Sequence, residues 1–402
     1  MKKILHLTFM IIVLFSLLKN IIPNNNYKAY ADSEKTNDNN TSNNNVDEAL
    51  DSILNSLDLE TYDNFINSLN ILNEEYSIKK LIENLLKNEF QFDLKYLLTY
   101  ITSCFFGNIK NLIIQALLII FICVLMSLLQ NLTSNFATNS TKKIVYLACY
   151  GTIITIACSM ITNCIEETAN SLNTITTFCN VVFPIALTLM TAIGATASVA
   201  IYQPIILIFS TILTRIINFI IMPLFYISLV FTIISNLSDD IKLDKISTFA
   251  KSAGDWILGL MFGIFITYTT AQGITGAGID NLAIKGSKYL LGNYVPIIGN
   301  YLKEGFDLIS AGCIVIKNAF GFVSIILLII ICLVPLLKTL SLILTIKLTA
   351  AITEPFADKK IVNMLCGISK NLKMLIVINI CITFSLIIVI MLIIGTGNSG
   401  GI

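Results

Sequence analysis

Long apolar runs alternate with short polar stretches over most of the chain. They occupy residues 112–129, 144–161, 178–193, 204–234, 256–274, 322–351 and 375–394. A helix that crosses a bilayer needs about 20 consecutive, mostly apolar residues. The pattern therefore predicts an all-α, multi-pass membrane domain over residues 112–402, with about seven to nine segments.

Three of these runs leave the number of segments open. Run 178–193 is short and contains Pro184, so it predicts a tilted span or a re-entrant segment. Run 204–234 contains Arg215 and Pro223 and fits either one broken helix or a hairpin that turns near Arg215. Run 322–351 contains two lysines and is expected to bend or to form a hairpin.

The N-terminal part has a different pattern. Residues 1–31 begin with two lysines, continue with an apolar core and end with the small-x-small pattern Ala29-Tyr30-Ala31, which predicts a cleaved secretory signal peptide. An uncleaved anchor helix is the alternative. Residues 32–45 are polar and predict a disordered linker. Residues 46–111 carry helical apolar spacing and predict a small, acidic, helical domain outside the cytoplasm.

Lysines between the runs predict the orientation, because cytoplasmic loops are enriched in Lys and Arg. Lys142 and Lys143 follow the first run and predict a cytoplasmic loop. Four more lysines place residues 352–374 in the cytoplasm, so the C-terminus is expected outside. Glu166 and Glu167 are expected in a loop on the outer side.

Composition supports an integral membrane protein. Hydrophobic residues make up 55% of the 402 residues and charged residues only 13%, against about 25% in an ordinary soluble domain. The net charge of +1 excludes a basic nucleic-acid binder, but it hides a division. Residues 32–111 hold 14 acidic and 6 basic side chains, whereas residues 112–402 hold 16 basic and 11 acidic ones.

The residue counts predict neither an enzyme nor a metal or cofactor site. The single histidine, His6, lies in the predicted signal peptide, which excludes histidine-based catalysis and histidine-ligated metals in the mature chain. The ten cysteines form no C-x-x-C pair. Several of them lie within apolar runs, where cysteine packs as a small hydrophobe, namely Cys123, Cys149, Cys158, Cys332 and Cys381. Nucleotide-binding glycine motifs are absent from the sequence.

Polar residues within the apolar runs are the candidate functional residues, because intramembrane charge usually has a function. Arg215 and Lys347 are the candidates, although a lysine near a helix end can also extend to the lipid headgroups. Gly259 and Gly263 have the G-x-x-x-G spacing of packed membrane helices. Gln272 and Gly273 begin a glycine-rich stretch that predicts a flexible exit from the span or an unwound helix end.

Residues 275–321 are predicted to be a long glycine-rich region that ends in an amphipathic helix at the membrane surface. With the preceding Gln272 and Gly273, this region is the candidate pore or partner region. Its further candidate residues are Lys288, Gly292, Asn293, Pro296 and Gly299.

Several phrases in this order resemble the stage III sporulation protein AE family of endospore-forming Firmicutes. They lie at residues 203–207, 222–225, 271–275, 287–289, 292–299 and 316–321. The phrase GNYVPIIG at 292–299 is the most specific. The resemblance covers most of the chain after residue 90. Family members often carry histidine before the proline at 204, where this chain has Gln203.

The resemblance implies a non-enzymatic subunit of a secretion-like channel complex that links mother cell and forespore and supports late forespore gene expression. The implied partners are ring-forming proteins, a secretion-type ATPase and the lipid bilayer. The implied location is the mother-cell membrane, with the N-terminal domain facing the forespore. A stand-alone small-solute transporter is the alternative, because prolines and glycines interrupt the spans. A membrane scaffold that conducts nothing is a third hypothesis.

Overall fold

The computed structural model describes residues 59–68, 79–80, 82, 84, 94–133, 139–237, 243–294 and 299–396. The chain divides into one unit over residues 1–49 and a second over residues 50–402, and the helices below belong to the second. The predicted signal peptide and linker lie outside the described residues. Helices and turns account for the described residues, without a strand, which confirms the all-α fold class.

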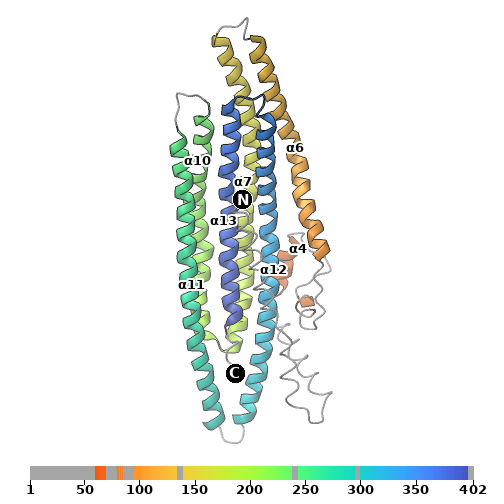
Figure 1. Cartoon of the computed structure of the whole chain (residues 1–402). Coiled ribbons are helices and arrows are strands. Elements are labelled where there is room, and N and C mark those ends of the chain that lie inside the picture. The colour runs from red at the N-terminus through yellow and green to blue at the C-terminus, as the bar shows by residue number, and fades with distance from the viewer. Residues whose placement is uncertain are drawn as a thin grey trace. The chain divides into compact units, whose positions relative to one another are not determined.

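One short helix and six long helical elements make up the described part (Figure 1). They are α4 (Glu60–Ser68), α6 (Leu94–Thr133), α7 (Asn139–Ile193), a composite helix over residues 196–235, α11 (Asp244–Tyr294), α12 (Gly299–Thr353) and α13 (Lys359–Gly395). The composite helix consists of α8 (Thr196–Leu207), η1 (Ile208–Leu213), α9 (Thr214–Ile216), η2 (Ile217–Ile221) and α10 (Met222–Ser235), where η marks a π-helical segment.

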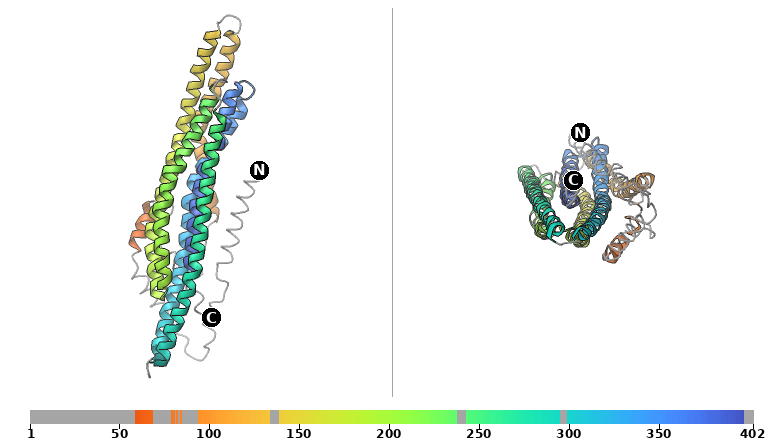
Figure 2. Two further views of the ribbon diagram at one scale, coloured as in Figure 1. Left: turned by 90° about the vertical axis from the view of Figure 1, so that its left-hand side faces the viewer. Right: turned by 90° about the horizontal axis from the view of Figure 1, so that it is seen from below.

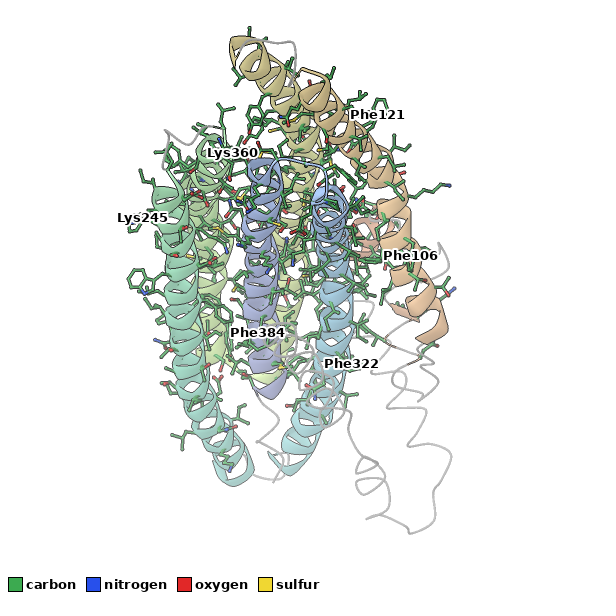
Figure 3. The ribbon with its side chains drawn as sticks, turned by 45° about the horizontal axis from the view of Figure 1, so that its top comes forward. Phe106, Phe121, Lys245, Phe322, Lys360 and Phe384 are labelled. Atoms are coloured by element: carbon green, nitrogen blue, oxygen red, sulfur yellow. The ribbon has the colours of Figure 1, made fainter. Side chains whose placement is uncertain are left out.

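The six long elements run side by side in alternating directions (Figures 1 and 2). The turns α6–α7, α10–α11 and α12–α13 share one end, which carries Lys245 and Lys360 (Figure 3) and is named the lysine-rich end below. The α7–α8 turn, the α11–α12 hairpin and the end of α13 share the opposite end, named the hairpin end. There α11 and α12 extend past the other helices (Figure 1).

All six elements are long and apolar enough to cross a membrane, within the described residues. The sequence predicts seven to nine segments, whereas the described residues hold six such helices, because the polar residues 162–177 do not end a helix. Residues 144–161 and 178–193 both lie in α7, which is 55 residues long, or about 80 Å at 1.5 Å per residue. That length exceeds a hydrocarbon core of about 30 Å, so α7 must extend beyond it.

The runs that contain prolines form continuous helices. Pro184 lies inside α7, and Pro335 lies inside α12 without a hairpin. Run 204–234 adopts the first of its two expected forms, a long irregular helix. Two π-helical segments flank Arg215 in the composite helix, and wider π-type turns mark local departures from regular helical hydrogen bonding.

Two expected boundaries fall within helices. The predicted division between residues 111 and 112 falls inside α6. Residues 275–294 continue α11, and residues 299–321 begin α12, so most of the predicted glycine-rich region is helical. Gly273 lies in the middle of α11 and is neither a helix end nor an unwound turn.

Helix α4 packs against the long helices. Tyr62 is fully buried, and its ring centroid lies 5.5 Å from that of Phe320 on α12 and 6.4 Å from that of Phe178 on α7. Its hydroxyl lies 3.4 Å from Ser324 Oγ. Burial raises the pKa of the Tyr62 hydroxyl, which stays neutral in this aromatic contact. Helix α4, which lies within the predicted N-terminal domain, therefore packs on α7 and α12.

The core lies around α12 and α13. In their most apolar windows 61% of residues are buried, against 22% in α11 and 28% in α6. Phe106 and Phe121 on α6 are 64% and 59% exposed and point away from the bundle (Figure 3). Large apolar side chains exposed along the outer helices are what a lipid-facing surface requires.

Candidate functional site: polar contacts within the helical bundle

An ion pair joins α7 and α12 within the long apolar helices. Lys338 Nζ donates to Glu167 Oε1 at 2.5 Å, and the side chains are 34% and 40% exposed. A charge within a membrane helix is costly unless it is paired or reaches water. The pair therefore lets both charged side chains remain within a helical interface.

Further polar contacts surround this pair and extend it to α6. Asn108 donates its amide to the backbone oxygen of Lys338 at 3.1 Å and to Ser341 Oγ. Cys164 Sγ lies 3.2 Å from Thr339 Oγ1. We name Asn108, Cys164, Glu167, Lys338, Thr339 and Ser341 the ion-pair cluster. It links three helices, α6, α7 and α12.

Sequence reasoning missed this cluster. Glu166 and Glu167 are predicted in an outer loop, whereas both lie in the middle of α7. The sequence feature that could have revealed this cluster is the pair of apolar runs on either side of residues 162–177. A single helix through them places an acidic residue between two apolar segments, and such a residue requires a basic partner like Lys338.

A second buried network lies near the lysine-rich end, between α10, α11 and α13. Asn371 donates its amide to Thr232 Oγ1 at 2.9 Å and accepts from Ser228 Oγ at 3.1 Å. Ser247 Oγ donates to the Ser228 backbone oxygen at 2.8 Å and lies 2.6 Å from Thr232 Oγ1. All four side chains are buried. Mutual hydrogen bonds remove the cost of burying them, so this network fixes helix packing.

Two buried charges bind helix ends near the hairpin end. Asp280 on α11 accepts the amides of Ala197 and Ser198 at the start of α8, at 2.8 and 3.0 Å. Lys317 on α12 donates to the backbone oxygens of Ile394, at 3.0 Å, and of Thr396, at the end of α13. Both side chains are 1% exposed.

The predicted glycine-rich candidates lie close to these charges. Gly273 is buried, and a Cβ there would lie 2.9 Å from Tyr202 Oη. Gln272 is half-buried on the same helix. The backbones of Lys288, Gly292 and Asn293 belong to the last part of α11, and Gly299 begins α12. Pro296 lies outside the described residues.

The two predicted intramembrane cations are not brought together with each other. Arg215 is exposed on α9, and Lys347 is exposed on α12. Lys347 lies six residues before the end of α12, about 9 Å along the axis, within reach of the membrane surface for a lysine side chain. Arg215 lies near the middle of the composite helix, far from both of its ends.

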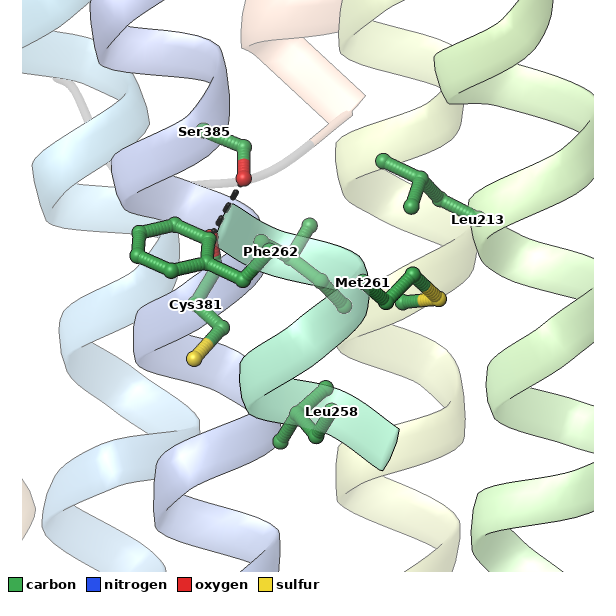
Figure 4. A pocket seen from close by; sticks show the side chains of 7 residues that line it. Leu213, Leu258, Met261, Phe262, Cys381 and Ser385 are labelled. Carbon is green, nitrogen blue, oxygen red and sulfur yellow. Dashed lines mark hydrogen bonds between the residues drawn. The ribbon is translucent and has the colours of Figure 1, made fainter. Parts of the chain in front are cut away.

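A small apolar hollow lies between the composite helix, α11 and α13 (Figure 4). Leu213, Leu258 and Phe262 line it together with Cys381 and Ser385. Ser385 Oγ donates to the Cys381 backbone oxygen at 2.8 Å, so its hydroxyl is satisfied within α13. The lining therefore offers few polar groups to a ligand.

Metal ligation finds no support in the described part of the chain, which holds no group of three or more His, Cys, Asp or Glu side chains placed to bind an ion. The polar clusters above instead join helices, and the ion-pair cluster and the two bound helix ends are their charged members. They are the sites where helix movement would require charges to separate.

The comparison with known families decides the assignment. The model of the family described as "Stage III sporulation protein AE" matches residues 76–397 of the chain. The chain belongs to this family. A protein of the same description from Bacillus subtilis (strain 168) is 28% identical over 278 residues, which is 69% of each chain. No solved structure matches the chain. The chain is thus a multi-pass membrane member of a sporulation family.

Proposed function

We propose that the chain is a membrane subunit of a secretion-like channel complex that links mother cell and forespore and is needed for late forespore gene expression. The match of the stage III sporulation protein AE family over residues 76–397 carries this proposal. The six apolar helices support a role within the membrane. The chain acts without catalysis, binding other subunits of the complex, namely ring-forming proteins and a secretion-type ATPase.

The proposed location is the mother-cell membrane, with the hairpin end facing the space between the two membranes. Lysines at the other end support this orientation, because basic residues favour the cytoplasmic side. Helix α4 supports it independently. It follows the predicted signal peptide, and its Tyr62 contacts Phe178 and Phe320, which lie nearer the hairpin end of α7 and α12.

The α11–α12 hairpin is the proposed contact with partner subunits. It extends past α7, α8 and α13 (Figure 1), so a ring-forming protein outside the membrane would meet it first. The candidate residues Gln272, Gly273, Lys288, Gly292, Asn293, Pro296 and Gly299 belong to this hairpin and its connection. Arg215 and Lys347 are proposed as polar contacts of the membrane region.

The stand-alone transporter has weaker support than the channel subunit. That alternative relies on spans broken at Pro184, Pro223 and Gly273. However, α7 and α11 run through Pro184 and Gly273, and Pro223 lies in the first turn of α10 within the composite helix. A transporter that binds its substrate at an unwound segment needs a break in one of these helices.

Deletion of the gene in a spore-forming host tests the proposal. We expect late forespore reporter expression and the yield of heat-resistant spores to fall, and a plasmid copy to restore both. Affinity purification from sporulating cells should recover ring-forming subunits with the chain. Normal spore yield and reporter expression after deletion would contradict the proposal. Transport by the purified chain alone in liposomes would favour the transporter.

A further inference from the structure

The two buried charges near the hairpin end lie on the two arms of one hairpin. Asp280 is on α11 and Lys317 is on α12, and the α11–α12 connection lies between them. Within the described residues neither has an oppositely charged side-chain partner, and both are 1% exposed. An unpaired buried ion costs several kcal/mol, roughly, unless other groups solvate it. Here backbone groups of two other helices do so.

The sign of each charge matches the helix end that it binds. The first amides of a helix carry partial positive charge, and the last carbonyl groups carry partial negative charge. Asp280 accepts from the first amides of α8, and Lys317 donates to the last carbonyl groups of α13. Exchanging the two charges would make both contacts repulsive.

Helix α8 also contacts the bound end of α13. Tyr202 Oη on α8 lies 3.4 Å from Thr396 Oγ1 at the end of α13. The contacts therefore run from α11 to α8, from α8 to α13 and from α13 to α12, and the hairpin connects α12 back to α11. These contacts and the connection join the four helices in a closed ring at this level of the bundle.

Glycines bring both arms of the hairpin close to the helices that they bind. A Cβ at Gly276 on α11 would lie 2.8 Å from Ser198 Oγ and 3.2 Å from Ser198 Cα. A Cβ at Gly321 on α12 would lie 2.5 Å from Ile394 Cγ1. These distances are shorter than ordinary van der Waals contact, so a larger side chain at either position would push its arm away from α8 or α13.

We propose that Asp280 and Lys317 form a charge clasp that holds the two arms of the α11–α12 hairpin against α8 and α13. The arms separate from these helices only when both charges leave the helix ends. The hairpin is then attached at two coupled points. Force on its outer part, applied by a bound partner, opens both attachments together. The clasp does not depend on the sporulation role, since it follows from contacts within one chain.

Cys313 is a native reporter for the clasp. It is 2% exposed and lies one helical turn before Lys317 on α12. The full chain in lipid nanodiscs is treated with a charged maleimide, and labelling of Cys313 is followed by peptide mass spectrometry. We expect Lys317→Met and Asp280→Asn each to raise the labelling rate about tenfold, the effect expected for loss of a helix-end contact. Lys285→Met, an exposed change on the same hairpin, should leave the rate unchanged.

Hydrogen exchange distinguishes a clasp from two separate caps. In a clasp, Lys317→Met speeds amide exchange at Ala197 and Ser198 as well as at Thr396. Likewise, Asp280→Asn speeds exchange at Thr396 as well as at Ala197 and Ser198. Changes confined to the near helix end, or unchanged Cys313 labelling, would overturn the proposal. If either variant fails to fold, hydrogen exchange of the wild-type chain tests the proposal. Its Ala197, Ser198 and Thr396 amides should exchange through one common opening, and independent opening rates would overturn the clasp.

Discussion

Glu167 and Lys338 are charged side chains on facing surfaces of α7 and α12. Each is partly exposed, so the pair is neither a surface salt bridge nor a fully buried one. Surface pairs contribute about 0–1 kcal/mol, whereas breaking a buried pair costs about 3–5 kcal/mol. The cost of breaking this pair is expected between these limits. It comes mainly from the charge that is left without a partner.

Removal and exchange of these charges give different expected results. Glu167→Gln or Lys338→Met should destabilise the chain by about 1–3 kcal/mol, because one unpaired charge remains. The exchange Glu167→Lys with Lys338→Glu should recover most of that loss. Unfolding in mixed micelles by SDS titration measures each variant. Glu166→Gln, an exposed neighbour on α7, is the matched control and should have no effect. An exchanged variant as unstable as the single variants would show that the pairing itself contributes nothing.

At the scale of helices, apolar runs predicted where helices lie but not where they end. Residues 162–177 separate two runs and contain several hydroxyl and amide side chains. Within α7, Thr174 and Thr177 donate to the backbone oxygens four residues earlier, and Glu167 has Lys338. The polar stretch therefore stays helical. Contacts such as Asp280 with Ala197 join residues 83 positions apart, and no local pattern predicts them.

The glycines of α11 differ in what surrounds them, and this gives a prediction for the element. A Cβ at Gly259 meets nothing within 4 Å, whereas at Gly276 it meets the backbone and side chain of Ser198. Gly276→Ala should cost about 1–3 kcal/mol through overpacking. Gly259→Ala should cost nothing and gain up to about 1 kcal/mol, because alanine favours a helix over glycine. Thermal unfolding in detergent compares them. Equal effects at both positions would contradict the close approach of α11 to α8.

At the scale of the whole membrane domain, the alternating directions of six helices determine which ends share a side. An even number of crossings returns the chain to the side from which α6 began. The C-terminus and the α11–α12 connection are then on the side of α4, and residues 354–358 are on the opposite side. The predicted orientation of the lysine-bearing loops agrees with this arrangement, although the sequence divides the spans differently.

Reporter fusions test this arrangement directly. Alkaline phosphatase fused after Thr396 should be active, because it folds only outside the cytoplasm, and a fusion after Ala357 should be inactive. A fluorescent protein at the same two positions should give the reverse result. Helix α13 alone separates the two positions, so opposite activities require it to cross the membrane. Equal phosphatase activity at both positions would mean that α13 does not cross the membrane. The hairpin end and the C-terminus could not then both face the forespore.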